Sequence, residues 1–189
     1  RNFVIDGERV QAIIPGDKTI SAVVPELHQL NNSIDDVRRQ TAGLIARAAR
    51  YNYLIILLNK SDGSWNAGLC CGNASASKED DVAYIKHTVE YIKSEYQIPN
   101  TVPIITVGVS NGAMMAADLN CKAPGLADAT ILASGGLEDV SCKYSTRVKD
   151  LLMVRSELDA TVPIGNKSRR EPIAPYYNNF LLRMLYPDS

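Results

Sequence analysis

The fold of this 189-residue chain is decided by one stretch, Ile104-Ile105-Thr106-Val107-Gly108-Val109-Ser110-Asn111-Gly112-Ala113-Met114-Met115-Ala116-Ala117-Asp118-Leu119. Its first residues form an apolar, β-branched run that predicts a buried strand. A helix-forming run comes last, and the turn between them has the pattern G-x-S-x-G. Because so tight a turn leaves no room for side chains, its two glycines are required. The stretch therefore predicts a strand, a sharp turn and a helix, with Ser110 held clear of the sheet.

Ser110 is a candidate nucleophile in this setting. At the N-terminus of a helix, its alkoxide and a later oxyanion lie near unpaired backbone N–H groups and the positive end of the helix dipole. The alternative is a glycine-rich connection in which the serine only caps the helix.

Outside this stretch, apolar runs alternate with amphipathic ones, which predicts an α/β fold. The last four expected strands are apolar throughout, as in parallel strands covered by helices on both faces. The expected strands are residues 10–14, 22–24, 53–58, 104–107, 129–132 and 151–154.

Two helices are expected between these strands. The first follows Ser33, a favourable N-cap with Asp36 three residues later, and continues to Ala48. The second places an apolar stripe over residues 82–96, after three acidic residues that favour a helix N-terminus. The stretch 61–77 has neither periodicity and predicts a long surface loop.

The length predicts a single domain, residues 1–189. Lys and Arg total 20 against 21 Asp and Glu, without a clustered basic run, which argues against a nucleic-acid partner. The longest strongly apolar run, 53–58, is far too short to cross a membrane. No cofactor motif is present and no cysteine pair has zinc-site spacing, so neither a cofactor nor a metal is expected.

The four cysteines, Cys70, Cys71, Cys121 and Cys142, predict disulfides and therefore a secreted, extracellular protein. Adjacent cysteines rarely bond to each other for geometric reasons. Cys70 and Cys71 are therefore expected to pair with Cys121 and Cys142, in an order that the sequence leaves open.

Three motifs together resemble the secreted α/β-hydrolase family of poly(3-hydroxybutyrate) depolymerases, feruloyl esterases and acetylxylan esterases. The resemblance covers nearly the whole chain, and the paired cysteines after Trp-Asn-Ala-Gly make it specific. The motifs are Ser64-Trp65-Asn66-Ala67-Gly68-Leu69-Cys70-Cys71-Gly72, Asp80-Asp81-Val82 and Gly108-Val109-Ser110-Asn111-Gly112-Ala113-Met114-Met115.

The resemblance implies roles for residues outside the turn. The segment Leu158-Asp159-Ala160-Thr161-Val162-Pro163 looks like the family's acid loop, so Asp159 would orient the catalytic histidine; the alternative is an aspartate that makes a turn. The oxyanion hole would use the N–H of Asn111 and an N–H near His28. Gln29 stands where the family has glycine, and the alternative for His28 is a loop histidine bonded to nearby backbone.

A catalytic histidine should follow Asp159 in this fold, and none does. Both histidines, His28 and His87, precede Ser110, and His87 is expected on the polar face of its helix. We therefore expect a truncated domain that lacks the last strand and its histidine turn, and a chain that alone is nearly inactive. The alternative is a natural pseudoenzyme.

The expected function is a serine carboxylic ester hydrolase that acts through an acyl-enzyme. Its substrates would be plant cell-wall esters, such as feruloyl or acetyl xylan, or polyhydroxyalkanoate-type polyesters. Trp65 would lie near the mouth of the site as a flat face for an aromatic acyl group or a sugar ring, unless it only packs its loop onto the domain. The alternative function is a catalytically inactive, carbohydrate-binding protein on the same fold.

Overall fold

The computed structural model describes residues 1–16, 19–137, 150–156, 158–159 and 161–162. Seven strands form one sheet in the order β1-β2-β4-β3-β5-β6-β7. The first three in this order pair antiparallel, and every later neighbour pairs parallel. The strands are β1 (Asn2–Ile5), β2 (Glu8–Ile13), β3 (Ala22–Leu27), β4 (Tyr53–Leu58), β5 (Ile105–Val109), β6 (Ala129–Ala133) and β7 (Asp150–Val154).

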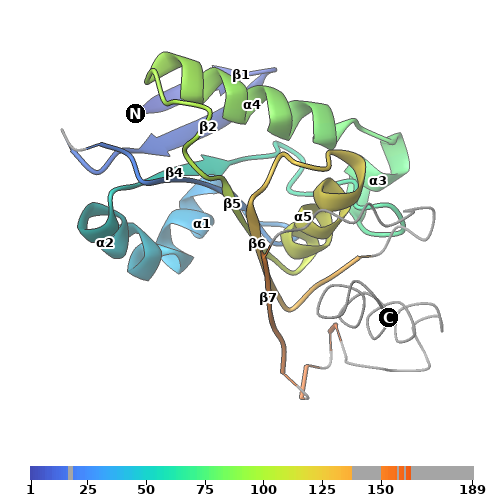
Figure 1. Ribbon diagram of the computed structural model, residues 1–189. Coiled ribbons are helices and arrows are strands. Elements are labelled where there is room, and N and C mark those ends of the chain that lie inside the picture. The colour runs from blue at the N-terminus through green and yellow to red at the C-terminus, as the bar shows by residue number, and fades with distance from the viewer. Residues whose placement is uncertain (17–18, 138–149, 157, 160, 163–189) are drawn as a thin grey trace.

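Helices cover both faces of this mostly parallel sheet, as the sequence predicts (Figure 1). One face packs on α1 (Ile34–Gln40) and α2 (Ala42–Tyr51), and the other on α4 (Asp81–Glu95) and α5 (Asn111–Lys122). The short α3 (Gly72–Ser77) precedes α4. Among the described helices, none is both long and apolar enough to cross a membrane.

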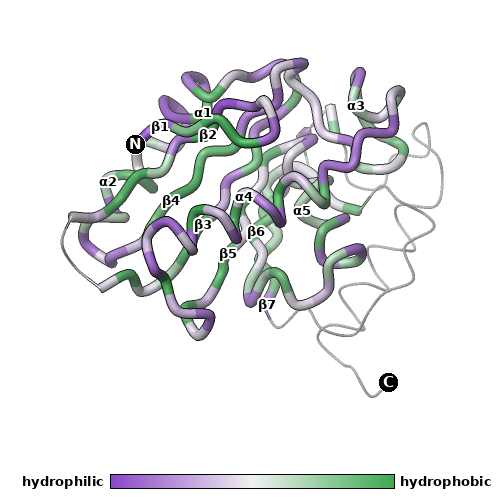
Figure 2. Tube along the Cα trace, turned by 90° about the horizontal axis from the view of Figure 1, so that it is seen from above, coloured by the Kyte–Doolittle hydropathy of each residue, from purple (hydrophilic) through white to green (hydrophobic). Residues whose placement is uncertain are grey.

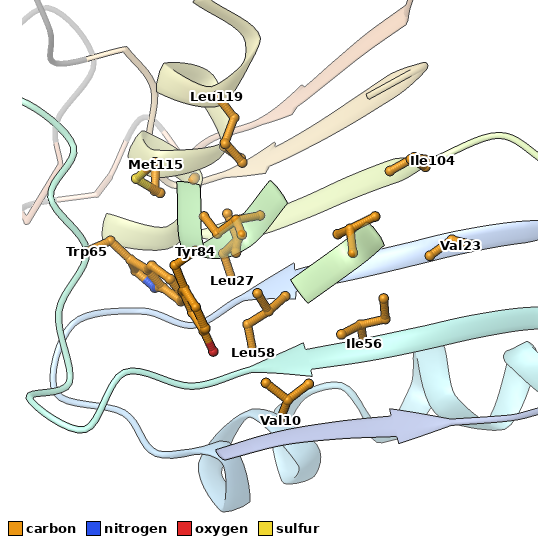
Figure 3. Close-up of a cluster of buried hydrophobic side chains, with 14 of the residues drawn as sticks. Val10, Val23, Leu27, Ile56, Leu58, Trp65, Tyr84, Ile104, Met115 and Leu119 are labelled. Carbon is orange, nitrogen blue, oxygen red and sulfur yellow. The ribbon is translucent and has the colours of Figure 1, made fainter. Parts of the chain in front are cut away.

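Side chains of the central strands alternate between two apolar cores. On β4, Leu54, Ile56 and Leu58 face the α4 and α5 side, and Ile55 and Leu57 face α1 and α2. All five are fully buried. Figure 2 shows these central strands as apolar segments, and Figure 3 shows the larger core with side chains from the strands, α4 and α5. This two-sided burial explains why the strands read as unbroken apolar runs.

Local signals account for two helix starts. Ser33 and Asp36 form the reciprocal capping box at α1, and the Asp80 side chain accepts a hydrogen bond from the Ala83 N–H at α4. The expected single helix from residue 34 to 48 is in fact two, because the backbone leaves helical geometry at Thr41. The expected loop 61–77 likewise contains a helix, α3, at its end.

The outer strand β7 differs from the other parallel strands. Leu152 and Val154 point to the α1 and α2 side but are 56% and 54% exposed. Among the described helices, α1 and α2 therefore leave these two side chains uncovered.

Candidate active site

Ser110 lies in a sharp turn between β5 and α5. Its backbone has a positive φ of 53° with ψ −118°, a combination that is uncommon for a residue with a side chain. A Cβ at Gly108 would lie 2.3 Å from the carbonyl oxygen of Gly112, and a Cβ at Gly112 would lie 2.1 Å from that of Leu27. Both glycines are therefore required, as the sequence predicts.

The Ser110 side chain does not cap α5, although the residue occupies the N-cap position. Its backbone N–H donates to the carbonyl oxygen of Ala133 on β6, at 2.8 Å, and its carbonyl accepts from Met114. The backbone is thus fixed on both sides while the hydroxyl makes no helix-capping bond. Ser110 is therefore not a capping serine, and its role as a nucleophile stays a prediction.

Two backbone N–H groups near this turn, those of Asn111 and Gln29, make no hydrogen bond within the described residues. The segment that carries Gln29 packs on the turn, because the Leu27 and His28 carbonyls lie against Gly112. The backbone of Gln29 does not have a positive φ, so its conformation does not require glycine there.

Asp159 lies beyond the carboxyl end of β7 and is half-buried. Its Oδ1 accepts hydrogen bonds from the N–H groups of Thr161 and Val162, both at 2.9 Å. These two bonds, first Val162 and then Thr161, lower the pKa of Asp159, and a bond with the Ser134 side chain adds to the effect. Because Ser134 follows Ala133, the carboxylate approaches the β6 end that also holds Ser110. The residue makes a turn and stays ionised, which is compatible with both sequence interpretations.

Comparison with solved structures identifies the architecture. A carboxylesterase from Mesorhizobium loti superposes with a TM-score of 0.67 at 14% identity, over 97% of this chain and 85% of that one. A thermostable esterase superposes with a TM-score of 0.66 at 19% identity, over 89% of this chain and 48% of its own. The chain has the α/β-hydrolase fold.

The acetyl xylan esterase from Aspergillus awamori shares this α/β-hydrolase fold at a TM-score of 0.53 and 16% identity, over 70% of this chain and 50% of that one. The chain therefore spans about half the length of this enzyme and of the thermostable esterase. No protein-family model matches the sequence. No curated protein matches it either.

Neither histidine of this α/β-hydrolase chain is placed to activate Ser110. His28 is buried, its Nε2 accepts the Lys60 N–H at 3.1 Å, and its Nδ1 lies 2.9 Å from the Gln29 carbonyl oxygen. Burial lowers the pKa of His28, so the ring is neutral and both nitrogens are engaged. These are the contacts expected of a loop histidine bonded to nearby backbone.

His87 is exposed on α4, as expected from its helix face, and pairs with Asp6 at 2.8 Å. Asp6 lies in the turn between β1 and β2, so His87 sits over the opposite edge of the sheet from β7.

Trp65 is fully buried and presents no face to a substrate. Its indole Nε1 donates to the His28 carbonyl oxygen at 2.9 Å, and its ring stacks on Tyr84, 6.3 Å away between ring centroids (Figure 3). Of the two sequence-based interpretations, these are the contacts of an anchor that packs the loop onto the domain. The expectation of a ring at the mouth of the site is therefore wrong for this structure.

The cysteine expectation also needs correction. Cys70 and Cys71 are bonded to each other and not to distant cysteines. Cys121 is also disulfide-bonded, and Cys142 lies outside the described residues.

The sequence did not reveal the role of the Asn111 side chain. Its Oδ1 accepts the Trp65 N–H at 2.8 Å, and its Nδ2 donates to the Trp65 carbonyl oxygen at 3.0 Å. Both residues are fully buried. The amide accepts through its oxygen and donates through its nitrogen, so it makes both bonds to the Trp65 backbone at once.

Proposed function

We propose that this chain carries the nucleophile and oxyanion hole of a secreted serine carboxylic ester hydrolase that works through an acyl-enzyme. The observation that carries the proposal is the positive-φ, non-capping Ser110 between β5 and α5, beside the Asn111 and Gln29 N–H groups that bond none of the described residues. The similarity to solved esterases supports the α/β-hydrolase fold on which this arrangement depends.

In the proposed reaction, the Ser110 hydroxyl oxygen attacks the ester carbonyl carbon while a base takes its proton. The negative charge on the former carbonyl oxygen is stabilised by the Asn111 and Gln29 N–H groups. The tetrahedral intermediate collapses, and the base returns the proton to the departing alcohol. Water then repeats these steps on the acyl-enzyme and releases the acid.

The base in this scheme is neither His28 nor His87, because the first is buried with both nitrogens engaged and the second lies over another part of the sheet. The scheme requires a histidine base that neither of these two residues supplies, and the ionised Asp159 would orient such a histidine. Without such a histidine, the chain alone should accelerate ester hydrolysis by only about 10³- to 10⁴-fold over the rate in water.

The proposed substrates are esters of plant cell-wall polysaccharide, feruloyl or acetyl, with polyhydroxyalkanoate-type polyesters as the other candidate. The sequence motifs around Trp65, Asp81 and Ser110 support this class, as does the shared fold of a solved acetyl xylan esterase.

The test supplies the base from solution. The chain is incubated with p-nitrophenyl acetate with and without imidazole, and acetylation is located by peptide mass spectrometry. We expect slow acetylation of Ser110 that imidazole accelerates, loss of the product in Ser110→Ala, and no change in Ser77→Ala, an exposed serine at the end of α3. Acetylation spread over lysines and unchanged by Ser110→Ala would refute the nucleophile assignment. Fast turnover without imidazole, abolished by Ser110→Ala, would refute the expected inactivity.

A second candidate is a carbohydrate-binding protein on the same fold, favoured by the engagement of both nitrogens of His28. It predicts saturable binding of xylo-oligosaccharides by calorimetry that Ser110→Ala leaves intact, with no acetylation of Ser110 even in the presence of imidazole.

A further inference from the structure

A buried cation lies at the start of the loop that follows β4. Lys60 is 9% exposed, and its Nζ is 3.0 Å from Asp81 Oδ1 and 3.9 Å from Glu8 Oε1, with Glu79 as a third carboxylate partner. Burial acts to lower the pKa of Lys60, but the bonds and charges of Glu79 and Asp81 outweigh it and raise that pKa. Lys60 therefore stays charged.

Asp81 shares its carboxylate between this cation and the loop. Oδ1 faces Lys60, and Oδ2 accepts the backbone N–H of Asn66 at 2.7 Å. The Asn66 side chain adds a second tie by donating to the Glu79 carbonyl oxygen at 2.8 Å. Since Asp81 is only 2% exposed, loss of Lys60 would leave a buried carboxylate without its cation. The ion pair thus holds the backbone next to Trp65.

The segments that carry the Gln29 and Asn111 N–H groups both contact the loop that contains Trp65. The Trp65 backbone bonds the Asn111 side chain twice, and the Trp65 indole bonds the His28 carbonyl, one residue before Gln29. The backbone N–H of Lys60 itself bonds the ring of His28. Displacement of Lys60 or Asn66 would therefore move Asn111 and the His28–Gln29 segment together.

From these contacts we infer that the buried Lys60–Asp81 ion pair positions the oxyanion hole, by fixing the Trp65 segment that holds Asn111 on one side and the His28–Gln29 segment on the other. Lys60 and Asp81 are positioning residues and touch no substrate. The inference deepens the proposed function, and only its last step, from N–H position to oxyanion binding, rests on it.

The variants are Lys60→Met and the milder, isosteric Asp81→Asn. Lys86→Met is the matched control for the first, because Lys86 is 57% exposed on α4 and 3.9 Å from Glu90. Asp80→Asn is the control for the second, because Asp80 is the exposed neighbour whose capping role asparagine can fill. Circular dichroism and thermal unfolding establish that each variant is folded, and Asp81→Asn remains informative if Lys60→Met is not.

Nuclear magnetic resonance detects movement of the Trp65, Gln29 and Asn111 N–H groups, and it does not require the chain to be catalytically active. Trp65 is the sole tryptophan, so its indole N–H gives one resolved signal. We expect this signal and the backbone N–H signals of Gln29 and Asn111 to shift or broaden in Lys60→Met and Asp81→Asn, and to stay in place in both controls. Unchanged signals in the two folded variants would overturn the inference, whatever the chain's activity.

Phenylboronic acid reads the consequence for oxyanion binding. The Ser110 oxygen adds to the trigonal boron, its proton leaves to solvent, and a tetrahedral boronate anion forms with an oxygen in the oxyanion hole. We expect the affinity, followed by boron resonance and calorimetry, to fall about tenfold or more in the two variants and to be unchanged in the controls.

The outcomes separate the inference from the proposed function. Shifted signals with an unchanged boronate affinity would overturn the inference and leave Ser110 as nucleophile. The absence of an adduct in the parent chain would count against the proposed function, and so would an adduct that Ser110→Ala also forms. In either case the nuclear magnetic resonance comparison alone would decide whether Lys60 and Asp81 are positioning residues.

Discussion

The carbonyl oxygen of Leu27 lies where a side chain at Gly112 would have to be, 2.1 Å from the position of its Cβ. Strand β3 and the start of α5 are therefore in backbone contact, and the contact brings the Gln29 segment to Ser110. Any residue larger than glycine at position 112 must separate these two elements.

Gly112→Ala should accordingly destabilise the protein by about 3 kcal/mol or more, because the clash is with backbone that cannot rotate away. Urea unfolding measures the loss. The matched change is Gly43→Ala in α2, where a Cβ meets nothing within 4 Å, and it should alter stability by less than about 1 kcal/mol. Equal stabilities of the two variants would contradict the close approach of β3 and α5.

Asn111→Asp should cost about 1 to 3 kcal/mol, because a carboxylate cannot donate to the Trp65 carbonyl oxygen and would leave it unpaired in a buried site. Chemical unfolding followed by circular dichroism gives the difference. Asn2→Asp, at an exposed position on β1, is the control and should be close to neutral. A stable Asn111→Asp variant would mean that the paired bonds to Trp65 are not retained in solution.

His28 makes stability sensitive to acid. Its folded pKa is below its usual value of about 6.5, so the unfolded chain binds the extra proton and stability is lost as the pH falls below that value. His28→Gln retains an acceptor for the Lys60 N–H and should lessen the difference between unfolding midpoints at about pH 5 and about pH 7.5. His87→Gln, which changes an exposed histidine, serves as the comparison. A full acid response in His28→Gln would show that other groups cause it.

Glu26 makes stability sensitive to base. Burial raises the pKa of this 2% exposed carboxyl to about 8 from 4.5. The folded protein holds the proton on Glu26 more tightly than the unfolded chain does. The resulting stability is fully present below about pH 4.5 and is lost as the pH rises through about 8, by a few kcal/mol in all. Glu26→Gln should therefore melt at a higher temperature than the parent at about pH 9 and at a similar one at about pH 4.5. Glu90→Gln, on the exposed face of α4, should show no such pH-dependent gain in melting temperature over the parent.

The disulfide between Cys70 and Cys71 predicts a simple mass-spectrometric result. Digestion without reductant should recover both residues in one peptide that lacks the two thiol hydrogens and carries no partner peptide. A cross-linked peptide that joins either residue to Cys121 would restore the pairing expected from sequence. Four free thiols would contradict the proposal that the protein is secreted.

Much of the fold can be predicted from local sequence patterns. The features that the sequence does not predict depend on contacts between residues far apart in the chain. The buried strands and α4 are predicted from the sequence because both faces of β4 and one stripe of α4 are apolar. Strand β1 is harder to predict because its apolar run is only three residues long and does not alternate with polar residues, although Val4 is 73% exposed. The break at Thr41 is likewise invisible, since the apolar spacing continues through it.

The candidate site shows the same division. Gly108, Ser110 and Gly112 are predicted because the turn is built from neighbours in sequence. The ion pair of Lys60 and Asp81 joins residues 21 positions apart, and the three acidic residues before α4 indicate only a favourable helix start. Asp80 fulfils that expectation as the cap, whereas Asp81 turns inward to the loop. No local signal distinguishes these two adjacent aspartates.

The exposed side chains of β7 matter for handling the protein. Leu152 and Val154 make an apolar stripe on the last strand of the described sheet, whose outer edge pairs with none of the other described strands. A strand with an open edge and an apolar face is a template for aggregation between chains. Leu152→Lys would place there the kind of gatekeeper charge that natural edge strands use, and would help to keep concentrated samples monomeric.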